Sequence, residues 1–149
     1  MSTATRTPTA PLPAPAAAAL RRLELAFASP VERLRIQIAR LEHSLQIQRD
    51  GLACDIAVMR NVALASLERA EAEGSFRVTV GEIADLRRQI SGLRRELAIV
   101  VRFEAASAHC RQLAGSADYD GCLEAQDEMA MCRCQLAAAG RLDLIGVSA

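Results

Sequence analysis

The chain has 149 residues, of which 51% are apolar, and it carries 18 basic and 18 acidic residues. This length suits one ordinary domain. Aromatic residues make up only 3%, so the core must come from Ala, Leu, Ile and Val, which favours closely packed helices and disfavours pockets for flat ligands. A net charge of zero disfavours sequence-independent binding to nucleic acid or to an anionic membrane. No run approaches the about 20 apolar residues that span a bilayer.

The N-terminal residues 1–15 form a tail rich in Thr, Pro and Ala. Its repeated prolines oppose helix formation, so the tail is predicted to be disordered. A short helix is predicted over residues 16–28. The chain does not open on a basic start followed by a long apolar run, so we expect no secretory signal. With five cysteines that are not spread as a disulfide framework, we expect a cytoplasmic location.

A long helix is predicted over residues 31–73. Ser29 and Pro30 mark its start, because serine caps helix N-termini and proline suits the first helical position. The apolar residues that follow alternate in steps of three and four, as in the seam of a coiled coil: Val31, Leu34, Ile38, Leu41 and Leu45. At Asp50-Gly51 the apolar stripe changes phase, which indicates either one bent helix or two helices that meet at a tight turn. We favour one bent helix, because strong helix formers lie on both sides.

A second long helix is predicted over residues 80–114. Gly74 would end the preceding helix, and residues 75–78 would form a connector. Thr79 and Glu82 then match a capping box, which marks a helix start. The stripe of this helix again has heptad spacing: Ile83, Leu86, Ile90, Leu93, Leu97 and Val100.

A last helix is predicted over residues 122–139, after a polar turn in which Asp118 and Asp120 are candidate caps. Gly115 and Gly140 are the expected stops of the second and last helices. The apolar residues after Gly140 must either dock on the helices or stay exposed.

These elements predict an all-α fold with a single helical domain over residues 16–149. Two long helices joined by a short connector must be antiparallel neighbours, so we expect a long coiled-coil-like hairpin with shorter flanking helices, in a bundle of three or four. Two helices that pack only on each other bury one side of each seam and leave the other side exposed. Partner binding or oligomerisation is therefore predicted at five seam residues: Leu34, Leu41, Ile90, Leu93 and Leu97.

The late cysteines and a histidine raise the question of a metal site. The candidates are His109, Cys110, Cys132 and Cys134. Residues two apart on a helix point about 200° apart, so Cys132 and Cys134 cannot both face one ion, and zinc commonly uses a Cys-x-x-Cys turn. Cys packs well as a small hydrophobe. We therefore expect packing roles and no metal or cofactor, with a cysteine-based redox-sensing or metal-binding bundle as the alternative.

Two arginine pairs lie beside the seam of the second long helix: Arg87, Arg88, Arg94 and Arg95. Guanidinium groups at these positions suit a phosphate or an acidic partner helix. They equally suit ion pairs with Asp85, with Glu96 or with the opposite helix. Because acids are interleaved with them, we favour ion pairs, and we expect no nucleic-acid partner.

The chain lacks a glycine-rich phosphate loop, a nucleophile motif and a Glu-x-x-His pair. We therefore predict a non-enzymatic helical module for protein–protein interaction: an adaptor, chaperone or structural subunit in a homo- or hetero-oligomer. The proline-rich start, the long helical pair and the length resemble small coiled-coil accessory proteins of bacterial export machines. This resemblance is one of architecture and covers the long hairpin only. It implies a partner in an export or assembly machine.

Overall fold

The computed structural model describes residues 28–61 and 65–146. These residues contain three α-helices, α2 (Pro30–Arg60), α3 (Ser66–Leu113) and α4 (Tyr119–Ala138), followed by the short 3-10 helix η1 (Leu142–Ile145). They include no strand, so the all-α class is confirmed. The predicted tail and residues 16–27 of the first predicted helix lie outside the described ranges. None of the helices in those ranges has a stretch both long and apolar enough to cross a bilayer.

The start of α2 agrees with the sequence prediction. The Ser29 hydroxyl accepts a hydrogen bond from the Glu32 backbone N–H at 3.2 Å, and the Glu32 carboxylate accepts one from the Ser29 N–H at 2.8 Å. This reciprocal pair is a capping box, and Pro30 follows it at the first helical position. The hydrogen bond from the Ser29 N–H is the main reason that the pKa of Glu32 is lowered.

Replacing Ser29 with Ala is expected to lower the free energy of unfolding by about 1 kcal/mol, because one N–H at the helix start loses its partner. The pKa of Glu32 is lower in the folded state, so its contribution is present above the unfolded value near 4.5 and is lost as the pH falls through the folded value. Thermal melts at pH 7 and pH 3 would check both points. A cost for Ser29→Ala that is as large at pH 3 as at pH 7 would contradict the coupling of the two residues.

The helix α2 continues through Asp50 and Gly51 without interruption, so a turn at this point is excluded. Its inward row keeps the steps of three and four beyond Leu45, but with polar members. The row runs through buried or half-buried residues: Leu45, Gln48, Leu52, Asp55 and Met59. The sequence suggested a change of phase at Asp50-Gly51 because only apolar residues were considered. Gln48 and Asp55 are polar but occupy seam positions, so the row keeps its phase.

The turn between the long helices lies elsewhere than predicted, so the predicted helices over residues 31–73 and 80–114 are wrong in their inner boundaries. The first ends at Arg60 with Asn61 as its C-cap, and the second begins at Ser66. The Asn61 N–H donates to the Val58 carbonyl at 3.1 Å. Asparagine is a poor helix former that favours turns and caps, and Asn61 is the only asparagine in the chain.

The predicted connector over residues 75–78 is an interior part of α3. Ala72 and Thr79 are both buried, and Phe76 between them is half-buried. With Ile83 they extend the heptad row of α3 toward its N-terminus in steps of four and three. Thr79 therefore faces inward rather than capping a helix, and burial along this row outweighs the about 1 kcal/mol that Gly74 costs in a helix.

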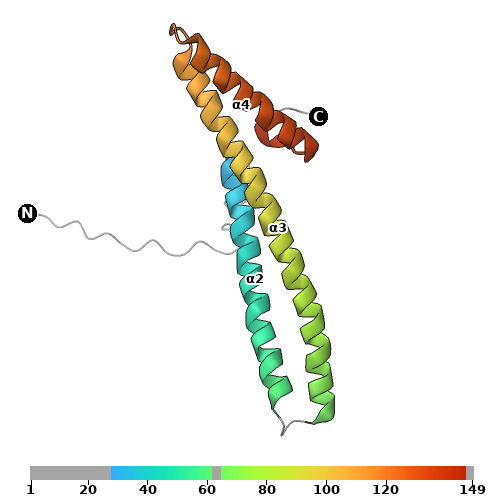
Figure 1. Ribbon diagram of the computed structural model, residues 1–149. Helices are drawn as coiled ribbons and strands as arrows, with labels where there is room; N and C mark the ends of the chain where they lie inside the picture. Colours follow the sequence, from blue (N-terminus) through green and yellow to red (C-terminus); the bar gives the residue numbers. More distant parts are fainter. Residues whose placement is uncertain (1–27, 62–64, 147–149) are drawn as a thin grey trace, which may run out of the picture.

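The long helices α2 and α3 lie side by side and run in opposite directions (Figure 1). A first cluster of buried residues lies along the pair, and Leu41, Leu52, Leu86, Leu93 and Leu97 pack against it. The members of this pair cluster are Ile38, Leu45, Ile83 and Ile90. An ion pair between Arg94 of α3 and Glu42 of α2, at 2.6 Å, also joins the two helices.

The shorter helix α4 packs on the C-terminal half of α3, and η1 returns the chain to the same region (Figure 1). A second cluster joins all four elements there. The members of this junction cluster are Val31, Leu34, Val100, Leu136 and Leu144. The predicted apolar tail thus docks, since Leu144 is buried. Ion pairs from Arg102 to Glu128 and from Arg141 to Glu96 also hold this end together.

Candidate functional site

The five seam residues that the sequence assigns to partner binding are used within the chain. Leu34 lies in the junction cluster and Ile90 in the pair cluster, both buried by the chain's own helices. Leu41, Leu93 and Leu97 are half-buried and pack against these clusters. In this arrangement the chain's own helices use these positions, and partner binding at them stays a prediction.

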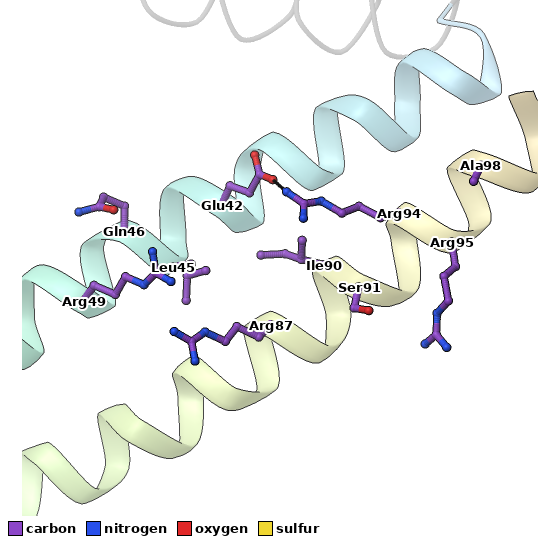
Figure 2. Close-up of a pocket in the computed structure, with 10 residues that line it drawn as sticks. All are labelled: Glu42, Leu45, Gln46, Arg49, Arg87, Ile90, Ser91, Arg94, Arg95 and Ala98. Carbon is purple, nitrogen blue, oxygen red and sulfur yellow. Dashed lines mark hydrogen bonds and ion pairs between the residues drawn. The ribbon is translucent and has the colours of Figure 1, made fainter.

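An open groove of 710 Å³ lies between α2 and α3. We call it the arginine groove. Figure 2 shows its lining residues, which are Glu42, Leu45, Gln46, Arg49, Arg87, Ile90, Ser91, Arg94, Arg95 and Ala98. Leu45 and Ile90 are 9% and 5% exposed, so they form an apolar floor that belongs to the pair cluster. The arginines rise from both helices around this floor.

The four arginines that the sequence singles out differ in the structure in whether they form an ion pair with a described residue. Arg94 pairs with Glu42 of the opposite helix, and Arg88 pairs with Asp85 one turn earlier. These two follow the favoured interpretation of ion pairs. Arg87 and Arg95 make no ion pair or hydrogen bond with any described residue, and both line the groove. Glu96, the other acid considered for them, pairs with Arg141 instead.

Arg49 is the third groove arginine without a partner among the described residues, and no role was predicted for it. It follows Leu45 by four residues, which places it on the seam side of α2. That spacing was the signal available in the sequence. In Figure 2, Arg49 from α2 and Arg87 from α3 extend toward one another over Leu45, whereas Arg95 points away from α2.

The groove is electrostatically unbalanced. Its lining carries four arginines and one glutamate, so its formal charge is 4 − 1 = +3, in a chain of net charge zero. A second groove of 610 Å³ between the same helices is lined by Arg40, Arg141 and Glu96, which sum to +1. Like charges that lie close together repel one another, so an anionic group bound in the arginine groove would relieve this repulsion.

The cysteine and histidine candidates do not converge. Cys132 is buried, Cys134 and His109 are exposed, and Cys110 is half-buried near the end of α3. Within residues 28–61 and 65–146, no three His, Cys, Asp or Glu side chains are arranged to hold a metal ion. Burial, with a smaller contribution from Glu128, raises the pKa of Cys132. That thiol therefore stays protonated and packs as a small apolar group.

One pairing of cysteines was not predicted. The Cys110 Sγ lies 3.9 Å from the Cys122 Sγ across the turn between α3 and α4. The signal was present in the sequence, because residues at equal distances from a short turn between antiparallel helices face one another. Only packing roles were predicted for the cysteines.

The comparisons with protein-family models, with curated proteins and with solved structures found no match to this chain.

Proposed function

We propose that the chain is a non-enzymatic helical module that binds an acidic segment of a partner protein in the arginine groove. It would act as an adaptor, chaperone or structural subunit. The observation that carries this proposal is the pair Arg49 and Arg87. Their guanidinium groups have no acidic partner among residues 28–61 and 65–146, and they extend toward one another from opposite helices (Figure 2). A carboxylate between them would accept charge-assisted hydrogen bonds from both.

The charge pattern of the groove favours a protein over a nucleic acid as the partner. Glu42 at the rim would repel closely spaced phosphates. Nucleic-acid binding would also draw on a positive net charge, and this chain has none.

The arrangement of α2 and α3 supports the same proposal. We infer coiled-coil-like packing between them from the unbroken heptad rows. A packed pair of this kind provides a stiff support that holds Arg49 and Arg87 apart at a fixed separation. Because the seam is buried inside the pair, recognition would depend on the charged groove rather than on Leu34, Ile90 and their neighbours.

The test is photo-crosslinking from inside the groove in the native cells. A benzophenone amino acid in place of Ser91, an exposed lining residue, would capture the partner segment, which mass spectrometry then identifies. We expect a segment rich in Asp and Glu. The double variant Arg49→Gln with Arg87→Gln should reduce the crosslinked yield about tenfold or more, because two charge-assisted hydrogen bonds are lost.

The matched control is Arg35→Gln with Arg60→Gln, which removes the same charge from exposed positions of α2 outside the groove. Its crosslinked yield should stay close to that of the wild type. Equal losses in the two double variants, or capture of segments without acidic residues, would overturn the proposal. Capture of nucleic acid at this position would do so as well.

A further inference from the structure

The turn between α3 and α4 places two thiols face to face. Cys110 lies three residues before the last residue of α3, and Cys122 lies three residues after the first residue of α4. Their Sγ atoms are 3.9 Å apart, and both side chains are half-buried. A disulfide needs an S–S distance of about 2.05 Å, so a small shift of the two side chains would bring the sulfurs to bonding distance.

The surrounding contacts hold the two helix ends in this position. Gly115 has a φ of +88° in the turn, and Asp118 caps α4 by accepting from the Gly121 N–H at 3.0 Å. About one helical turn away from the thiols, Ala106 of α3 and Ala125 of α4 are buried. Such small residues allow the helices to approach closely. The proximity of the thiols thus follows from packing on both sides of them.

The other cysteines have no comparable arrangement. Cys54 and Cys134 are exposed on α2 and α4, and Cys132 is buried near Glu128. We propose that Cys110 and Cys122 form a reversible dithiol site, which a small-molecule disulfide such as oxidised glutathione converts into a covalent link between α3 and α4. This site lies on a different part of the fold from the arginine groove and does not depend on the proposed function.

The reaction is two successive thiol–disulfide exchanges. The thiolate of one cysteine attacks a sulfur of the small disulfide, whose S–S bond breaks, and one small thiol leaves. The second cysteine then attacks the Sγ of the mixed disulfide, the intramolecular S–S bond forms, and the second small thiol leaves. The protein loses two electrons and two protons, and the small disulfide gains them.

The pKa of Cys122 indicates the order of attack. It is raised first of all by the hydrogen bond with the Cys110 thiol and next by burial. The raised pKa makes Cys122 a poor first nucleophile, because only the thiolate attacks, so we assign the first attack to Cys110. Once Cys110 is in the mixed disulfide, its thiol hydrogen bond no longer holds up the pKa of Cys122. That change favours the second attack.

The test is oxidation of the full chain in glutathione buffers, followed by peptide mapping without reduction. Cleavage after arginine releases Cys110 in the peptide 103–111, whereas Cys122 shares the peptide 112–133 with Cys132. Fragment spectra must therefore assign the linked cysteine. We expect a Cys110–Cys122 link that forms faster at higher pH, because only thiolates attack disulfides. We also expect a midpoint of thermal unfolding about 10 °C higher, because the link lowers the conformational entropy of the unfolded chain.

Cys110→Ser and Cys122→Ser should each abolish the link, and reduction should reverse the thermal shift in the wild type. The control Cys54→Ser with Cys134→Ser should leave both the link and the shift intact. Circular dichroism would establish that the serine variants remain helical. Oxidation through Cys54 or Cys134 in place of this pair, or a chain that stays fully reduced in oxidised glutathione, would overturn the proposal.

Discussion

Replacing Leu136 with Ala is expected to lower the free energy of unfolding by about 3–4 kcal/mol, the range for a large-to-small change in a core that cannot collapse around the gap. The Leu136 side chain of α4 has 0% exposure and lies in the junction cluster with Leu34 of α2 and Val100 of α3. This cluster is where every described element meets. The substitution should therefore weaken the whole fold rather than release α4 alone.

Chemical denaturation followed by circular dichroism would measure this loss. The matched control is Leu123→Ala, the same change in the same helix at a position that is 58% exposed, which should alter stability by no more than about 0.5 kcal/mol. Equal effects of the two substitutions would mean that α4 does not pack on α3 through Leu136. A two-step transition in the Leu136 variant would mean that α4 unfolds by itself.

Replacing Ser75 with Pro is expected to cost about 3 kcal/mol or more, because Ser75 lies in the interior of α3. Proline there removes the hydrogen bond to the carbonyl of Glu71 and places its ring against that carbonyl. If residues 75–78 formed a connector, as the capping signals suggest, proline would be tolerated. Denaturation midpoints for Ser75→Pro and Ser75→Ala would separate the two arrangements.

Gly74→Ala, at the neighbouring position, is expected to raise the stability of the fold, whereas Ser75→Pro lowers it. An added Cβ at Gly74 would meet no atom within 4 Å, and Gly74 has no positive φ. Alanine should therefore stabilise the helix by about 1 kcal/mol. A helix-terminal glycine, such as Gly115 with its φ of +88°, would respond by losing stability. Destabilisation by Gly74→Ala would therefore place a helix end near residue 74.

The outer boundaries of the helices could be predicted from the sequence, but the turn between α2 and α3 could not. Ser29-Pro30 and Gly115 mark helix ends through local hydrogen bonding and local φ, which a few neighbouring residues decide. The same kind of local signal at Thr79 and Glu82 was misleading, because Thr79 is a buried residue in the interior of α3. Asn61 was the weaker local signal and the correct one.

The arginine groove shows the same division between local and tertiary information. The arginine-rich face of α3 is visible in the sequence. Whether each arginine is paired depends on which residue lies opposite. Glu42 lies across from Arg94 and pairs with it at 2.6 Å, whereas Arg87 extends toward another arginine, Arg49 (Figure 2). Spacing along one helix can place an arginine on the seam side, but it cannot show which residue of the other helix lies opposite.

The sequence by itself determined the helical class, the heptad rows and the signals that start α2 and end α3, because these depend on residues within one or two turns of each other. Only the tertiary structure decided that the seam is internal, that Arg49 and Arg87 converge and that Cys110 faces Cys122. Those features depend on the register between helices. That register is set by burial of the complete rows, including their Ala, Thr and Gln members, and by the position of the turn at Asn61.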